Sequence, residues 1–144
     1  MSLVVDDHLL LDLLLGSPSP WLRAESERSA VYTTGSWYYR VALAAKRGSG
    51  VGAISRRIAT LDTEPQRRVL DWLGQLPDWI GLLGPRLLVP VMAGLDTRAQ
   101  PNLLAAEALA VALVTDSEVA VATDSPLLRG CALDLGIGYR VDPR

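Results

Sequence analysis

Two short apolar segments constrain the fold of this chain most, because each one ends in an aspartate and runs directly into a helical pattern. The first, "LVVD", lies in a strand predicted over residues 2–6 and is followed by "DHLLLDLLLG". The second, "EVAVATD", has its strand over residues 118–123, ends at Asp124 and is followed by "SPLLRGCALDLG". Short β-branched runs of this kind predict buried strands. Strands joined through helices pair in parallel, with right-handed crossovers. The sequence therefore predicts an α/β fold in which helices flank a small parallel β-sheet.

The rest of the chain is predicted to be mostly helical. Asp6 or Asp7 can cap the first helix, with Asp7 favoured, and Gly16 ends it. "RLLVPVMAGL" is apolar but contains Pro90, so both a helix and an edge strand stay open. The glycines of "GSGVGAIS" predict a loop. Further helices are expected in "WLRAESERSA", in "GSWYYRVALAAKRG" with a cap near Thr34 or Ser36, in "EPQRRVLDWLGQLP" and over residues 101–113, and short strands in "AVYTT" and "GYRV".

Length and composition exclude several classes of protein. A chain of 144 residues is expected to form one domain over residues 1–144. The single cysteine, Cys131, excludes an internal disulfide framework, and one His with one Cys cannot build a zinc site. No segment reaches the roughly 18 apolar residues needed to cross a bilayer, and acids rather than bases precede the leucine-rich run that begins at Leu9. We therefore expect a soluble cytoplasmic protein without a membrane partner.

Charge is unevenly distributed along the chain. The net charge is −2, yet residues 40–68 hold seven bases against two acids, which makes this middle segment +5. Arginine supplies most of the basic residues, and its planar fork suits phosphate groups. The segment therefore indicates either a nucleic-acid partner or a solvated helical surface.

Three carboxylates are candidates for a metal site. If the two strands are neighbours, Asp6 and Asp124 face one crevice at the carboxyl edge of the sheet. Glu107 lies on the apolar face of the helix predicted over residues 101–113, where a charge needs an arginine, a shared proton or a metal as partner. Carboxylates without His or Cys suit Mg²⁺ or Mn²⁺. Such a metal with arginines nearby is suited to the hydrolysis of phosphodiesters.

The order of these segments resembles a PIN domain, the fold of many prokaryotic toxin ribonucleases. "LVVDDHLLLDLLLG" is similar to the opening strand, catalytic aspartate and first helix of that family. "NLLAAEALAVALVTDSEVAVATDSPLLRGCALDLGIGYRV" is similar to its closing half. The resemblance implies a Rossmann-like three-layer fold, with Asp6 and Asp124 matching the first and last acids of the family. The second acid is replaced by Tyr38 or Tyr39, and the third is present only if Glu107 substitutes for it.

The resemblance implies two alternative functions. The first is a divergent ribonuclease, the toxin of a toxin–antitoxin type of system, in which Asp6, Glu107 and Asp124 hold Mg²⁺ or Mn²⁺. The second is a catalytically inactive protein that binds RNA or a protein partner such as an antitoxin-like peptide. A homodimer is expected in either case. The residues expected to contact RNA are Tyr38, Tyr39, Arg40, Arg56 and Arg57.

Overall fold

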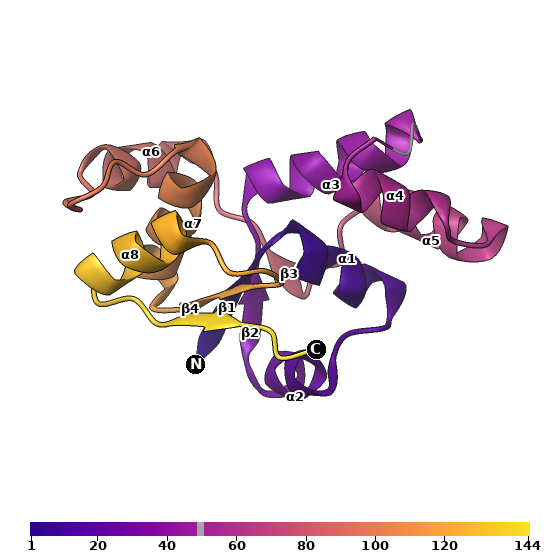
Figure 1. The fold of residues 1–144 in the computed structure, drawn as a ribbon, viewed down its shortest axis with the longest axis horizontal. Coiled ribbons are helices and arrows are strands. Elements are labelled where there is room, and N and C mark those ends of the chain that lie inside the picture. The colour runs from indigo at the N-terminus through magenta and orange to yellow at the C-terminus, as the bar shows by residue number, and fades with distance from the viewer. Residues whose placement is uncertain (49–50) are drawn as a thin grey trace.

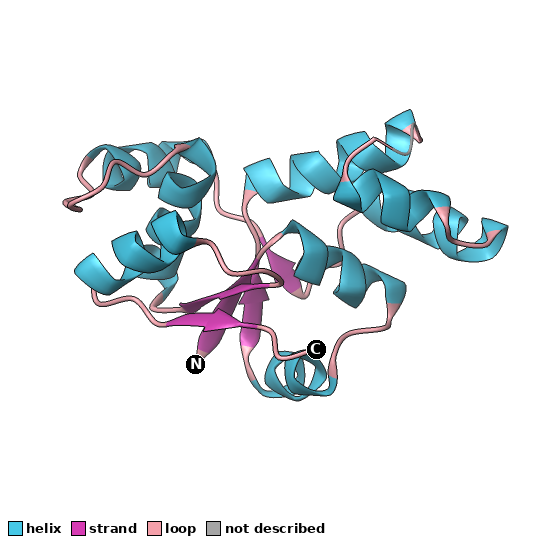
Figure 2. Ribbon diagram, in the orientation of Figure 1, coloured by secondary structure: helices cyan, strands magenta, loops and turns pink. Residues whose placement is uncertain are grey.

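The computed structural model describes residues 1–48 and 51–144, which form a parallel sheet with helices on both faces (Figure 1, Figure 2). The strands are β1 (Ser2–Val5), β2 (Ala30–Tyr32), β3 (Ile80–Gly81), β4 (Glu118–Val121) and β5 (Tyr139–Val141). The helices are α1 (Asp7–Leu15), α2 (Pro20–Arg28), α3 (Gly35–Arg47), α4 (Ala53–Ala59), α5 (Thr63–Gly74), α6 (Pro85–Ala93), α7 (Leu103–Thr115) and α8 (Pro126–Asp134). The predicted fold class, a parallel α/β sheet in a three-layer arrangement, is confirmed.

The five strands of the described chain lie in the order β3-β2-β1-β4-β5. The first strand is therefore central, with β2 on one side and β4 on the other, and Val5 lies opposite Ala120. Every neighbouring pair is parallel, as strands joined through helical crossovers must be. The two strands that the sequence identifies most clearly are thus direct neighbours, and the residues that follow them meet at one edge of the sheet.

Alternation along the strands divides the core into two clusters. Leu3 and Val5 of β1 pack into a cluster built mainly with helices α1, α3, α4 and α5. Val4, between them, packs into the opposite cluster with α6, α7 and α8. Successive side chains of a strand point to opposite faces, so both faces of the sheet are buried. Figure 1 shows the consequence: α3, α4 and α5 gather at one end of the molecule and α6, α7 and α8 at the other.

Several predicted boundaries agree with the structure. Gly16 ends α1 with a left-handed backbone (φ +71°), a conformation that glycine adopts without steric cost. Thr34 begins α3, since its hydroxyl accepts a hydrogen bond from the backbone N–H of Trp37 at 3.0 Å. The segment around Pro90 is the helix α6, which settles the question that the sequence leaves open.

Three predicted features are wrong, and one strand was not predicted. β4 ends at Val121 rather than at residue 123, so Asp124 lies in the loop beyond the strand. Asp6, not Asp7, caps α1. The predicted loop "GSGVGAIS" contains the start of α4, although its residues 49–50 lie outside the described residues. The two-residue strand β3 was not predicted, because so short a segment shows no alternation.

None of the helices in the described part of the chain is both long enough and apolar enough to span a membrane.

Candidate functional site: the carboxyl edge of the sheet

Asp6 lies at the carboxyl end of the central strand and joins it to the neighbouring strand. One carboxylate oxygen, Oδ1, accepts a hydrogen bond from the N–H of Leu9 at 2.9 Å, and Oδ2 accepts one from the N–H of Ala122 at 2.9 Å. The side chain is 8% exposed. Burial raises the pKa of Asp6 to about 6, against the lowering effect of its two hydrogen bonds, and the charge of Asp7 raises it further. Asp6 is thus both a helix cap and a link between β1 and the end of β4.

Asp7 is buried and points toward α3. Its Oδ1 accepts a hydrogen bond from the N–H of His8, and its Oδ2 lies 3.3 Å from Nη1 of Arg40. Oδ2 accepts no hydrogen bond from any described residue, so the guanidinium of Arg40 is its counter-charge. Removing Arg40 would leave a buried carboxylate without a counter-charge, which is costly. Arg40 therefore has a structural role besides any contact with a ligand.

Glu107 has a partner that the sequence did not predict. Its carboxylate accepts hydrogen bonds from the hydroxyl of Ser36 and, at 3.3 Å, from the N–H of Ser36. Ser36 lies in the first turn of α3, where the helix dipole stabilises negative charge. The start of a helix thus replaces the arginine, proton or metal that we expected. The apolar face predicted for this helix, which comprises Leu103, Leu104, Ala108 and Val111, is wrong at its start, because Leu103 is 70% exposed.

Asp124 lies apart from the buried carboxylates. It is exposed, its Oδ2 lies 2.6 Å from Nη1 of Arg129, and its Oδ1 accepts a hydrogen bond from the hydroxyl of Tyr139 at 3.0 Å. Burial raises the pKa of Tyr139, and its hydrogen bond to Asp124 acts in the same direction. These contacts join the loop after β4 to α8 and β5.

The three predicted metal ligands therefore do not form a set in this arrangement. Asp6 is held by backbone N–H groups, Glu107 by Ser36, and Asp124 by Arg129 and Tyr139. Over residues 1–48 and 51–144, no group of three or more His, Cys, Asp or Glu side chains is placed to hold a metal ion. The side chains as placed do not fit Mg²⁺ or Mn²⁺, and metal binding stays a prediction.

A basic pocket lies beside this edge, between α1, α3 and the start of α4. It has a volume of about 260 Å³, and its charged or titratable lining residues are His8, Arg40 and Arg47, with no carboxylate among the described ones. Arg40 and Arg47 are seven residues apart on α3, which places them on one face of the helix. Burial lowers the pKa of His8, although the charge of Asp7 acts in the opposite direction. The arginines therefore supply the positive charge of this pocket at neutral pH.

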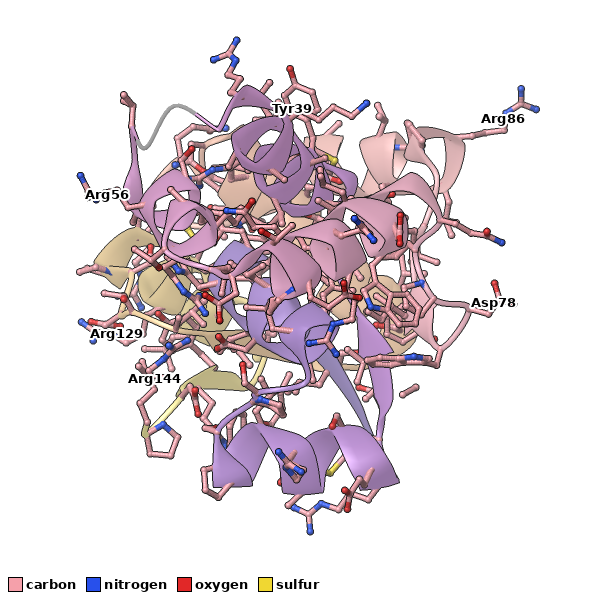
Figure 3. All side chains as sticks on the ribbon, turned by 90° about the vertical axis from the view of Figure 1, so that its right-hand side faces the viewer. Tyr39, Arg56, Asp78, Arg86, Arg129 and Arg144 are labelled. Atoms are coloured by element: carbon pink, nitrogen blue, oxygen red, sulfur yellow. The ribbon has the colours of Figure 1, made fainter. Side chains whose placement is uncertain are left out.

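The other predicted RNA-contacting residues have different surroundings. Tyr38 is half-buried against the core and donates its hydroxyl to the carbonyl oxygen of Leu73. Tyr39 is 63% exposed. Arg56 is exposed, and Figure 3 shows both Tyr39 and Arg56 projecting outward from α3 and α4. Of Tyr38, Tyr39, Arg56 and Arg57, only Tyr39 and Arg56 are therefore exposed.

Arg57, the last of the predicted set, is half-buried and forms an ion pair with Asp12. The buried carboxylate of Asp12 pairs with Arg57 through one oxygen and with Arg144 at 2.8 Å through the other. Arg57 also lies 3.2 Å from Nδ1 of His8. The sequence gives no signal for the contact between Asp12 and Arg144, which are 132 positions apart. The sequence could have predicted Arg47 as a residue of the basic pocket, because it lies seven positions after Arg40 on the same predicted helix.

The fold and this edge define a class: an α/β protein with an all-parallel sheet whose polar and charged side chains collect at its carboxyl edge. No known protein-family model matches the sequence, and no curated protein matches it either.

Proposed function

We propose that this chain is a PIN-like RNA-binding protein that holds the phosphate backbone in the basic pocket beside the carboxyl edge of the sheet. The observation that carries the proposal is the pocket itself. Arg40 and Arg47 line it together, and none of its described lining residues is acidic. A guanidinium group matches the geometry of a phosphate with two parallel hydrogen bonds.

The surroundings of the pocket support an extended single strand as ligand. Lys46, Arg47 and Arg56 are exposed and have no ion pair with any described residue. Their charges are therefore available to a polyanion. Tyr39, on the same helix as two of them, is exposed and can stack on an unpaired base. The PIN-like resemblance also supports the proposal. Its first segment forms a strand and a helix, β1 and α1, and its second forms α7, β4, α8 and β5, which is the order of elements that the resemblance implies.

The proposal is tested by fluorescence anisotropy with a labelled single-stranded RNA dodecamer, in EDTA, over a series of salt concentrations. Arg47→Ala removes a cation that has no intramolecular partner among the described residues, so folding should be unaffected. We expect weaker binding and a loss of about 0.7 from the slope of log K against log salt. Tyr39→Ala should weaken binding by about 1–3 kcal/mol.

Arg23→Ala is the matched control, because Arg23 is also exposed but belongs to α2, which supplies none of the described lining residues of the pocket and lies away from α3 and α4 in Figure 1. Equal binding by wild type, Arg47→Ala and Tyr39→Ala would contradict the proposal. So would an equal loss of binding in Arg23→Ala, because it would indicate attraction to net charge alone.

A metal-dependent ribonuclease is the second candidate. It is favoured by the place of Asp6, a buried carboxylate at the carboxyl end of the central strand. The same RNA incubated with millimolar Mn²⁺ tests it. The ribonuclease is supported if wild type cleaves the RNA and Asp6→Asn still binds the RNA but does not cleave it.

A further inference from the structure

Helix α6 presents an apolar surface that nothing in the described chain covers. Its sequence, "PRLLVPVMA", contains one polar residue, Arg86. Only Leu88 is fully buried, whereas Val89 is 55% exposed. Nearby, Leu103 at the start of α7 is 70% exposed. Neighbouring exposed aliphatic side chains of this kind mark surfaces that are covered by a partner.

A groove runs along this surface, between α6 and the start of α7. Its volume is about 220 Å³, and Leu83, Leu88, Val89, Met92 and Leu103 form most of its wall. Such a volume accommodates one or two aliphatic side chains. Helix α6 packs mainly on α7, so the wall of the groove is a fixed part of the fold.

Glu107 supplies the one charge among the described lining residues of this groove. Its carboxylate is hydrogen-bonded to Ser36, but no described cation forms an ion pair with it. A carboxylate at the side of an apolar groove attracts a positive group, because the neighbouring apolar walls reduce screening by water. The groove is therefore complementary to a ligand that combines aliphatic groups with a cation.

The size of the surface indicates what kind of ligand this is. A nine-residue helix is about 14 Å long and 10–12 Å wide, so α6 with the start of α7 exposes far less than the roughly 800 Å² per subunit of a stable interface. A second copy of this chain would find too little surface here. A short segment that inserts one or two side chains needs much less.

We propose that this groove binds a short amphipathic peptide segment of another protein, with one or two aliphatic side chains between α6 and α7 and an adjacent arginine or lysine on Glu107. The proposal is independent of RNA binding, because the basic pocket is lined by α1, α3 and the start of α4.

The test is selection of binders from a displayed library of random dodecapeptides on the full chain. We expect enrichment of peptides with Leu, Ile or Val beside Arg or Lys. Binding of a selected peptide should be lost in Val89→Asp, which places a charge in the groove. Glu107→Gln should weaken it roughly five-fold, and should have no effect on the same peptide with its basic residue changed to Gln.

Leu133→Asp is the matched control, since Leu133 is a 79% exposed leucine on α8 that does not line the groove. It should leave binding unchanged. The proposal is overturned if no peptide is enriched, if binding survives Val89→Asp, or if the effect of Glu107→Gln does not depend on the basic residue. It is also overturned if the chain sediments as a dimer that Val89→Asp dissociates, since a second copy would then occupy the groove.

Discussion

The carboxylates at the carboxyl edge differ in how the protein stabilises their charge. Asp7 and Asp12 pair with arginines and Glu107 with the start of α3, whereas Asp6 has two backbone N–H groups and no ion pair among the described residues. The hydrogen bonds of Asp6 do not offset its burial, because its pKa is raised to about 6. The protonation of Asp6 therefore responds to pH near 6.

The pKa of Asp6 predicts a pH dependence of stability. In the folded state its pKa is about 6, above the ordinary value of 3.8, so the folded state binds more protons between these values. The contribution of Asp6 to stability is fully present below pH 3.8 and is lost as the pH rises through 6. Relative to Asp6→Asn, the free energy of unfolding of wild type should fall by up to about 3 kcal/mol between pH 4 and 7. Urea unfolding of both proteins measures this difference.

A direct titration separates the causes of the shift. The side-chain carbon signal of Asp6, followed by NMR, should titrate near pH 6 in wild type and at a lower pH in Asp7→Asn, because a neighbouring negative charge is removed. An Asp6 that titrates near pH 4 in wild type would show that its two hydrogen bonds outweigh its burial.

The beginning of α3 connects several parts of the edge. Thr33 donates its hydroxyl to the carbonyl oxygen of Val5 at 2.9 Å, Thr34 caps the helix, and Ser36 holds Glu107 of α7. Two neighbouring side chains, Thr33 and Thr34, are fully buried or nearly so. This one turn therefore fixes α3 to the central strand and to the helix on the other side of the sheet.

Removing the cap of α3 should destabilise the protein by a moderate amount. Thr34→Ala leaves the N–H of Trp37 without its acceptor, and the loss of a helix cap costs about 1 kcal/mol. Thr34→Ser keeps the oxygen and should recover most of this stability. Chemical denaturation of the three proteins compares them; an unchanged midpoint for Thr34→Ala would show that the cap contributes nothing.

At the scale of the whole molecule, β1 holds the two halves together. It pairs with strands on both sides, and its alternate residues enter the two clusters of the core. β3 and β5, in contrast, lie at the edges of the sheet and have one neighbour each. Unfolding of β1 would therefore disrupt both clusters of the core.

Hydrogen exchange should follow this arrangement. The backbone amides of β1 and β4 should exchange only through global unfolding, whereas those of β3 and β5 should exchange through local opening at lower free energy. Native-state hydrogen exchange, measured by NMR or mass spectrometry, gives the order in which the strands exchange. Faster exchange in β1 than in β5 would contradict a core centred on the first strand.

The sequence by itself determined the parallel α/β fold, because β-branched runs and apolar helical periodicities depend only on local spacing. It also identified the end of β1, at which Asp6 lies. Tertiary structure alone decided the partners of each carboxylate: Ser36 for Glu107, Arg40 for Asp7, and Arg57 with Arg144 for Asp12. These pairs join residues up to 132 positions apart, and no local pattern specifies them. The exposed surface of α6 is likewise a tertiary result, since burial depends on what the fold places against a helix and not on the apolarity of its own sequence.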